Sequence, residues 1–421
     1  MRSPCKKRLC LLQIRASNGT MHGMTLFPSL SADVRALVDS IPYLVDRIFP
    51  LPGQFRRALP HDIAELSHML TNNRGSRTAS YLGKPALLSA YLRYFLPWNV
   101  YRLCRLFPSL PLRLRPDDMI VDLGSGPLTF VIALWIAKPE LRAMPLEFRC
   151  IDHTQAVLAA GKKVFLALAG ADSVWTIKAI KGDIHAPVYG KRPALSAAVN
   201  VFNETYQNLP HTVSLEHEAD KIGRRLAVLA PQALVVEPGV PRSGEFIVSL
   251  RNALIRAGFV PQSPCPQSGA CALAPHIEAF GGAYSGAKAK WCHFAFPTLD
   301  APEALLKLSA DSGLPKERAV LSFLFAAAGA VKAEHEAATL HASATLQARV
   351  LSDAFPLPPL AMGRKPLAGR YACSEKGLVL VRGGEGAIER LSAGTLVSFH
   401  VPKPEKRDKK TNALLVDSAV T

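Results

Sequence analysis

Apolar runs and helical periodicity alternate through the middle of the chain, from Asp118 to about Val260. A short apolar run, Met119 to Leu123, is followed by the tight turn Gly124 to Pro127 and by an apolar segment from Leu128 onward, which predicts a strand, a turn and a helix. Further strands are predicted at LEFRCID, VWTIKAI, ALSAAVNVF and ALVVEPG, with a helix at LEHEADKIGRRLAVL. This alternation is typical of a parallel sheet covered by helices, so we expect a doubly wound α/β fold.

The segments on either side have different patterns. Apolar residues recur at three-to-four spacing between Leu30 and Leu110, which predicts amphipathic helices. The apolar stretch LSFLFAAAGAV is interpreted as a buried helix, and the last part of the chain is rich in Val, Leu and Gly with turns. The predicted organisation is a flexible or mis-assigned N-terminus (1–29), a basic helical domain (30–115), the sheet domain with a cysteine-bearing insertion (116–300), a helical segment (301–362), a β-rich region (363–402) and a disordered basic tail (403–421).

The turn at Gly124 and Gly126 indicates a ligand site. Glycine adopts backbone angles that other residues resist and lets a ligand approach the main chain, and the N-terminus of the next helix offers free N–H groups. Dinucleotide-binding dehydrogenases and S-adenosylmethionine (SAM) methyltransferases both use this layout. Asp122, just before the turn, is typical of methyltransferases, whereas the dinucleotide motif needs a third glycine where Thr129 stands. A SAM site is therefore favoured over a nicotinamide site, and a turn without a ligand is the alternative.

Polar side chains follow the other predicted strands. Asp152 ends the second strand, where an acid can accept hydrogen bonds from ribose hydroxyls. Asp183 follows the third strand and suits an adenine, although a solvated loop acid is the alternative. Asn203 and Glu204 stand where substrate-facing groups are common, but the region has no Asn-Pro-Pro-Tyr motif and no cysteine, so the catalytic residues stay unassigned. The predicted cofactor-binding residues are Asp122, Gly124, Ser125, Gly126, Pro127, Asp152, Asp183 and Asn200.

The charge of the chain favours an anionic partner. Its 421 residues are 49% hydrophobic, enough for a sizeable core, and carry a formal net charge of +17. Residues 1–115 hold 17 Lys and Arg against 5 Asp and Glu. In this segment basic residues alternate with Tyr81, Tyr91, Tyr94, Trp98 and Tyr101, so phosphates and unpaired bases of RNA are a fitting partner, and a helical core with a solvated basic face is the alternative. The predicted RNA-binding residues are Arg74, Arg77, Lys84 and Arg93.

The N-terminal sequence and the cysteines give information about the cellular compartment of the protein. The first twenty residues are basic, but the apolar run LCLLQI is too short for a signal peptide, so we expect either an organelle-targeting segment or a true start at Met21 or Met24. No stretch approaches eighteen apolar residues, so no membrane association is expected. The eight cysteines are dispersed, which favours a reducing compartment over a disulfide framework.

Four of the cysteines are candidate metal ligands. Cys265 and Cys271 lie in a proline-rich insertion, Cys292 in the strand-like KWCHFAF, and Cys373 in the β-rich region. Four thiolates suit a soft metal centre. The spacing lacks the paired Cys-x-x-Cys of structural zinc, and iron–sulfur clusters accept irregular spacing. Buried free cysteines in the core are the alternative.

Several motifs, in order, resemble those of the mitochondrial and bacterial small-ribosomal-subunit methyltransferase-like family, which includes methyltransferase-like protein 17. The matching stretches span roughly residues 60 to 400 and are LTNNRGSRTASYLGKPALLSAYLRYFLPWN, VDLGSGPLT, VVEPGVPRSGEFIVSLRNALIRAG, CPQSGACAL, WCHF and the late Cys373. One position departs from the family: its turn usually reads Gly-x-Gly-Pro-Gly, and Leu128 stands at the last glycine. A side chain there is expected to narrow the methionine pocket.

The resemblance implies a SAM-binding domain and a role on the RNA of the small ribosomal subunit, in assembly or translation. It also implies a four-iron, four-sulfur cluster held by Cys265, Cys271, Cys292 and Cys373, with zinc as the alternative metal. Two functions remain open: an RNA methyltransferase, and a non-catalytic assembly factor that uses the SAM fold and the cluster as an RNA-binding scaffold. Such a protein is expected to be a monomer away from the ribosome, in the bacterial cytoplasm or the mitochondrial matrix.

Overall fold

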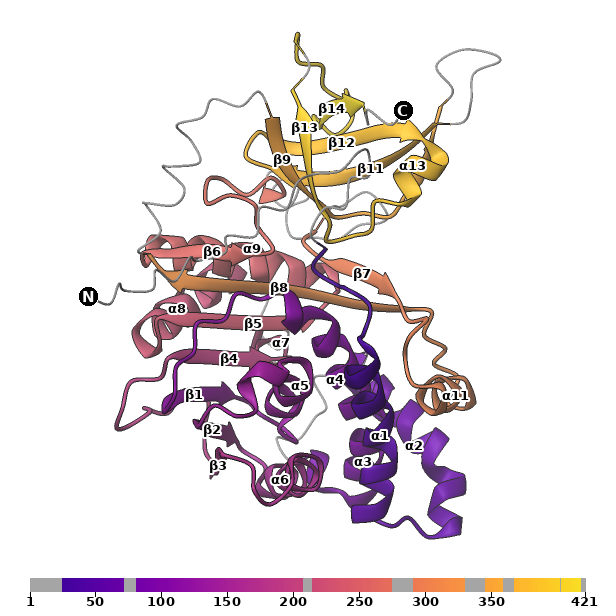
Figure 1. Ribbon diagram of the computed structural model, residues 1–421, viewed down its shortest axis with the longest axis vertical. Helices are drawn as coiled ribbons and strands as arrows, with labels where there is room; N and C mark the ends of the chain where they lie inside the picture. Colours follow the sequence, from indigo (N-terminus) through magenta and orange to yellow (C-terminus); the bar gives the residue numbers. More distant parts are fainter. Residues whose placement is uncertain are drawn as a thin grey trace, which may run out of the picture.

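The computed structural model describes residues 25–71, 81–206, 214–274, 291–329, 345–358, 367–401 and 403–417. A helical part lies beside a large sheet with helices on both faces, and a smaller β-rich part lies at one end of the long axis (Figure 1). This architecture confirms the predicted fold class. None of the helices in these ranges has the length and apolar character needed to cross a membrane.

The helical part is built on amphipathic helices. Its elements are α1 (Ala32–Ile48), α2 (Gly53–Thr71), η2 (Tyr81–Gly83), α3 (Pro85–Ala90), the π-helical turn η3 (Tyr91–Phe95), α4 (Leu96–Leu106) and η4 (Phe107–Ser109). The Ser31 side chain caps α1 by accepting a hydrogen bond from the Val34 N–H. One face of α1 is buried against α4, α5 and α6, so the helical part is packed onto the sheet domain.

The large sheet has the order β3-β2-β1-β4-β5-β8-β6, and β7 pairs with β8. Strands β1 to β5 are parallel, whereas β8 runs antiparallel to β5, β6 and β7. The chain reverses direction across the sheet between β1 and β4, and ligands of such sheets bind at this point. The strands are β1 (Asp118–Leu123), β2 (Leu146–Asp152), β3 (Trp175–Lys181), β4 (Leu195–Val199), β5 (Gln232–Pro238), β6 (Phe259–Ser263), β7 (Phe294–Pro297) and β8 (Arg318–Ala328).

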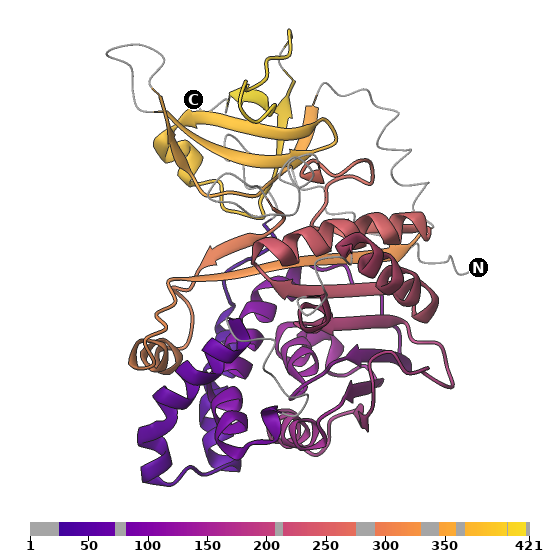
Figure 2. The same cartoon turned by 180° about the vertical axis from the view of Figure 1, so that it is seen from behind.

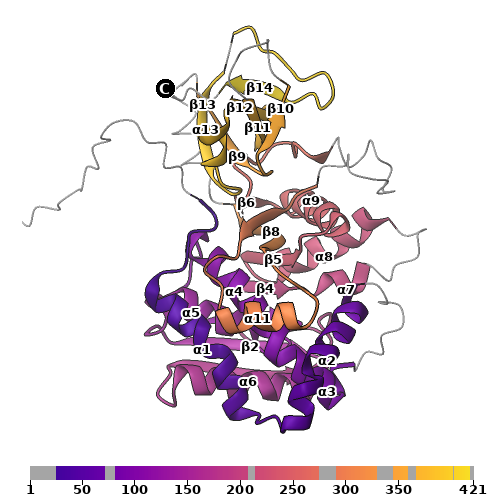
Figure 3. The same cartoon turned by 90° about the vertical axis from the view of Figure 1, so that its right-hand side faces the viewer.

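Helices cover both faces of this sheet. On one face α5 (Thr129–Ala137) and α6 (Gln155–Ala169) pack beneath the helical part, and on the other lie α7 (Phe202–Tyr206), α8 (Leu215–Leu229) and α9 (Pro241–Arg256) (Figures 2 and 3). The side chains of α5 are buried on nearly every side, which explains its apolar sequence. The remaining elements here are η5 (Pro139–Leu141) and α11 (Glu303–Asp311).

The interpretation of LSFLFAAAGAV as a buried helix is wrong. Residues 318–328 form β8, an eleven-residue strand between β5 and β6. An inner strand buried on both faces has a continuous apolar sequence, which periodicity cannot distinguish from a buried helix. The segment 301–362 is therefore not helical as a whole: it contains α11, β8, β9 (Thr345–Val350) and β10 (Phe355–Leu357), and the sheet domain extends past residue 300.

The β-rich part has a small core of its own. Its sheet has the order β13-β9-β11-β12-β14, and β10 pairs with β11. The prediction of a disordered tail from residue 403 is wrong for β14 (Leu414–Asp417), which lies parallel to β12. The side chains of Leu414 and Val416 are buried in this core. Their burial stabilises an ordered strand, although the preceding residues 403–410 are highly charged. The other elements are β11 (Leu367–Ser374), β12 (Gly377–Gly384), α13 (Glu385–Glu389) and β13 (Leu396–His400).

Candidate functional site

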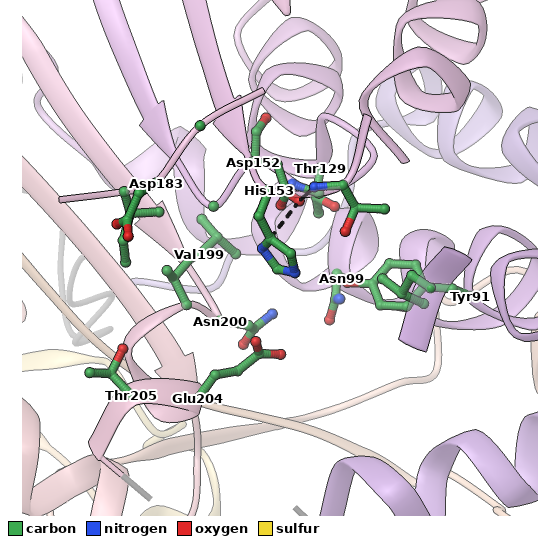
Figure 4. A pocket seen from close by; sticks show the side chains of 18 of the residues that line it. Tyr91, Asn99, Thr129, Asp152, His153, Asp183, Val199, Asn200, Glu204 and Thr205 are labelled. Atoms are coloured by element: carbon green, nitrogen blue, oxygen red, sulfur yellow. Dashed lines mark hydrogen bonds and ion pairs between the residues drawn. The ribbon is translucent and has the colours of Figure 1, made fainter. Parts of the chain in front are cut away.

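A cavity of about 430 Å³ opens at the carboxyl ends of β1, β2, β3 and β4 (Figure 4). It lies at the point where the strand order reverses. Six of the predicted cofactor-binding residues line it together with side chains from the helical part and from α7. The lining residues are Leu82, Tyr91, Asn99, Gly124, Ser125, Gly126, Thr129, Asp152, His153, Thr154, Gly182, Asp183, Ile184, His185, Val199, Asn200, Val201, Glu204 and Thr205.

The glycine turn forms one wall of the cavity. Gly124 and Gly126 have φ angles of +62° and +53°, in the left-handed region that favours glycine. A Cβ atom at Gly124 would lie 2.6 Å from Cγ2 of Val201, so the turn and the connection after β4 are in close contact. Leu128 also has a positive φ, 59°, but its side chain is buried in the core and does not line the cavity. The expectation that Leu128 narrows the pocket is therefore wrong.

Asp122 and Pro127 support the turn from beneath. The Asp122 carboxylate is buried and accepts a hydrogen bond from the Ser125 hydroxyl. Burial raises the pKa of Asp122 to about 7, against the opposing effect of the Ser125 hydrogen bond. The Pro127 backbone packs so closely on Gly161 of α6 that a Cβ there would lie 2.2 Å from it. These two predicted residues thus position the turn without lining the cavity.

Asp152 connects the turn to the second strand. One carboxylate oxygen, Oδ2, accepts a hydrogen bond from the Gly126 N–H at 3.0 Å, and the other, Oδ1, accepts one from the Thr154 N–H at 2.8 Å. A carboxylate has about four acceptor positions, so both oxygens keep a free lone pair. The carboxylate therefore fixes the loops on either side of it and can still accept hydrogen bonds from a ligand in the cavity.

Asp183 and Asn200 also line the cavity, with Asp183 opposite Tyr91 and Asn99, and Asn200 beside Glu204 (Figure 4). Asp183 is exposed and accepts a hydrogen bond from the His185 N–H at 2.6 Å. Asn200 has a φ of 57°, and its Oδ1 atom is buried without a hydrogen-bond partner among the described residues. The protein encloses this oxygen, so the unpaired acceptor carries a desolvation cost.

The helical part contributes a wall that the sequence analysis missed. The π-helical turn η3 and helix α4 bring Tyr91 and Asn99 to the cavity. Arg102 donates to Asn99 and, at 2.8 Å, to the Val320 carbonyl of β8. Burial, followed by the charges of Glu204 and Asp152, raises the pKa of Tyr91, so its hydroxyl is a donor at neutral pH. Only the long-range packing of α4 on the sheet reveals this wall.

Glu237 fixes the helix that carries Glu204. Its fully buried carboxylate accepts hydrogen bonds from the backbone N–H groups of Phe202 (2.9 Å) and Asn203 (3.1 Å), at the start of α7. Burial raises the pKa of Glu237 to about 8, although these hydrogen bonds oppose the shift. The carboxylate at the end of β5 thus fixes the position of α7 and of the cavity residue Glu204 that α7 carries.

This buried acid makes stability depend on pH. The folded protein holds a proton on Glu237 between pH 4.5 and about 8, while the unfolded chain has released it, so the free energy of unfolding decreases as pH rises through this window. We expect Glu237→Gln to remove roughly 1 kcal/mol per pH unit from that slope. Urea denaturation from pH 5 to 8 measures it, with the exposed Glu140→Gln as the control. An unchanged slope in Glu237→Gln would contradict this assignment.

The predicted RNA-binding residues differ in their surroundings. Arg74 and Arg77 lie outside the described residues, and Lys84 is exposed. Arg93 is not available to RNA: its guanidinium is buried and donates to Asp46 (2.9 Å), Ser89 and the Phe49 carbonyl. It joins α1 to the π-helical turn.

The neighbouring aromatic residues are core residues as well. Tyr94, Trp98 and Tyr101 are buried, and Asp300 accepts hydrogen bonds from both Tyr101 and Arg105 at 2.6 Å. Of the two interpretations that the sequence left open for this segment, the helical core applies to these residues.

The four cysteines come together although they are distant in the sequence. Cys265 and Cys271 follow β6, Cys292 precedes β7, and Cys373 lies in β11. Burial raises the pKa of Cys373 well above its usual value, and the other three thiols add to this shift, which they can do only from nearby. Nε of Arg251 on α9 donates to Sγ of Cys265 at 3.2 Å. This group of four cysteines, which we call the cysteine cluster, therefore joins the insertion, the large sheet and the β-rich part.

Comparison with known proteins gives one family and several similar structures. A model of the family described as mitochondrial small ribosomal subunit Rsm22 matches residues 113–351. No curated protein matches. Magnesium protoporphyrin IX methyltransferase from Synechocystis, solved with SAM, is 12% identical over 64% of this chain and 97% of its own, with a TM-score of 0.30. A methyltransferase described as putative, from Thermoplasma acidophilum, is 11% identical over 52% of this chain and 71% of its own, also with a TM-score of 0.30.

Proposed function

This chain belongs to the family of mitochondrial small ribosomal subunit Rsm22, and from this membership we propose that it binds SAM and acts on the RNA of the small ribosomal subunit during assembly or translation. The observation that carries the proposal is the cavity at the reversal of the strand order, which the glycine turn, Asp152 and Asn200 line together. The protein would work where the ribosome is assembled, in the mitochondrial matrix or the bacterial cytoplasm.

The residues present fit SAM. The glycine turn, which lets a ligand approach the main chain, suits the methionine portion. The free lone pairs of Asp152 suit the ribose hydroxyls, and Asp183 with the neighbouring backbone suits the adenine. When bound, SAM supplies a methyl group on a positively charged sulfur. Asn99, Tyr91 and Glu204, which also line the cavity, are the groups we assign to the substrate. A protonated Tyr91 can donate a hydrogen bond there and cannot act as a base.

For the four cysteines we propose a four-iron, four-sulfur cluster. Four thiolate ligands suit such a cluster. A tetrahedral zinc site has Zn–S bonds of about 2.3 Å and hence sulfurs about 3.8 Å apart. In the described part of the chain, the only ligand trio whose atoms lie within 4.8 Å of one another is His61, Asp62 and Glu65, on the α2 surface.

A scaffold function remains the second candidate. The cysteine cluster contacts three parts of the chain, so a bound metal would hold the β-rich part on the sheet domain without any role in methyl transfer. In that case SAM binding and the cluster would stabilise a surface that binds ribosomal RNA.

One purification tests both candidates. We expect protein purified without oxygen to contain about four iron atoms per chain, to bind SAM by calorimetry and to carry small-subunit RNA, identified by sequencing. A methylated nucleotide formed in that RNA on addition of SAM would support the methyltransferase, and its absence the scaffold. Tight binding of NADH with no binding of SAM would contradict the proposal, as would co-purification of unrelated RNA only.

The proposal also predicts the effect of Asp152→Asn. The amide keeps one acceptor oxygen but loses the charge and an acceptor for the ribose, and hydrogen bonds to charged groups contribute about 1.5–3 kcal/mol. We expect the Kd for SAM to rise roughly 10- to 100-fold. Calorimetry measures it, with the exposed Asp172→Asn as the matched control. Equal affinity of both variants and the wild type would exclude a ribose at Asp152.

A further inference from the structure

A second hollow, of about 560 Å³, lies beside the connection from β3 to β4. Residues 186–193 of this connection form one side, and the C-terminal half of α8 forms the other. Residues 182–185 of the same connection line the cofactor cavity, and the two hollows share no residue. We call the second hollow the basic groove, because Arg192, Arg224 and Arg225 line it.

The connection that forms the groove is held in one shape by cationic side chains. Arg225 donates to the carbonyls of Ile184, His185 and Ala186. Three further side chains fasten the rest: Arg149 donates to the Tyr189 carbonyl, Lys191 to that of Asp117 and Arg192 to that of Ala227. A segment without helix or strand is thereby preorganised, and preorganisation lowers the entropic cost of binding.

The groove carries positive charge, and an exposed tyrosine lies on the segment that forms one of its sides. Among its described lining residues none is acidic. Arg224 is exposed and has no ion-pair partner in the described part of the chain. Tyr189, between the lining residues Val188 and Gly190, is 77% exposed, and Val228 on the opposite wall is 79% exposed.

We propose that the basic groove binds single-stranded RNA, with phosphates at Arg192 and Arg224 and a base stacked on Tyr189. Proteins that bind single-stranded nucleic acids combine a positively charged groove with aromatic rings on which bases stack. Arg192 donates one N–H to the Ala227 carbonyl and is otherwise exposed. Arg93 and Arg105 of the helical part, by contrast, are engaged in internal contacts. The β3–β4 connection lines both the groove and the cofactor cavity. An RNA bound in the groove would therefore lie beside that cavity. This inference rests on the proposed function and adds the surface through which RNA is bound.

The test measures the Kd of a fluorescein-labelled single-stranded RNA by anisotropy at about 50 to 300 mM KCl. The slope of log Kd against log salt concentration reports the number of phosphate contacts. We expect Tyr189→Ala to raise the Kd roughly 5- to 100-fold at every salt concentration, as loss of one stacked base does. We expect Arg224→Ala to reduce the magnitude of the salt slope by about 0.7. The controls are Tyr43→Ala, on the 70% exposed tyrosine of α1, and the exposed Arg390→Ala.

The controls should bind RNA as the wild type does, and all four variants should keep the SAM affinity. Equal RNA affinity of Tyr189→Ala and Tyr43→Ala would overturn the inference while leaving the proposed function intact. Binding of an acidic peptide that is lost in Tyr189→Ala, with RNA binding unchanged, would assign the groove to a protein partner instead. If the wild type binds neither SAM nor RNA, the proposed function itself fails.

Discussion

Replacing Gly124 with alanine is expected to abolish SAM binding, with a rise in Kd of roughly 100-fold or more, or about 3 kcal/mol. The new Cβ would lie 2.6 Å from Cγ2 of Val201, a distance that real Cβ contacts do not reach, so the turn or the β4–α7 connection must move. Both segments line the cavity. The positive φ of +62° adds a backbone cost of about 1–2 kcal/mol in the folded state. Calorimetry measures the affinity and thermal unfolding the stability.

Gly170→Ala is the matched control for this prediction. Gly170 ends α6 with a φ of +83°, and a Cβ there would have no atom within 4 Å. This variant should lose stability through the backbone alone and keep its SAM affinity. If Gly124→Ala binds SAM as tightly as Gly170→Ala does, the turn is not the cofactor site.

Serine replacements at Cys265, Cys271, Cys292 and Cys373, made one at a time, are expected to remove the metal and to lower the melting temperature together. Metal binding by ligands that meet only in the folded protein contributes to folding free energy. These cysteines connect the insertion and β7 to β11 of the β-rich part, so loss of the metal should loosen the join between the two sheets. Iron content, visible absorbance and thermal unfolding of protein purified without oxygen measure the effect.

Cys104→Ala and Cys150→Ala are the controls, because both cysteines are buried away from the cluster, in α4 and in β2. They should retain iron and colour whatever their effect on stability. Stoichiometric zinc in the wild type would replace the iron–sulfur proposal with a structural zinc site. If no metal is found and only one or two serine variants are destabilised, the four cysteines are core residues.

Some features of the site follow from local sequence and were predicted for that reason. A glycine turn between an apolar strand and an apolar helix has one common geometry, and the positive φ angles of Gly124 and Gly126 agree with it. Parallel strands bring their carboxyl ends to one edge, so the residues at the ends of β1, β2, β3 and β4 meet there whatever the connections between them. This explains why Asp152, Asp183 and Asn200 line one cavity.

The errors arose where one local pattern has two tertiary solutions. The apolar run in β8 fits a buried helix or an inner strand, and only pairing with β5 and β6 decides between them. Arg93 and Tyr101 look like a surface for RNA, yet they are satisfied by Asp46 and Asp300, which are 47 and 199 residues away in the sequence. Leu128 has the positive φ that favours glycine, but its side chain is buried in the core.

The sequence alone determined the doubly wound sheet, the glycine turn and the acids at the strand ends, because these depend on contacts between near neighbours and on the common direction of parallel strands. Only the tertiary structure decided that Tyr91 and Asn99 close the cavity, that four distant cysteines converge, and that Arg225 fastens the connection after β3. Each of these depends on segments brought together by packing of the whole core. The partner of a buried or charged side chain is set by that packing, and no local pattern specifies it.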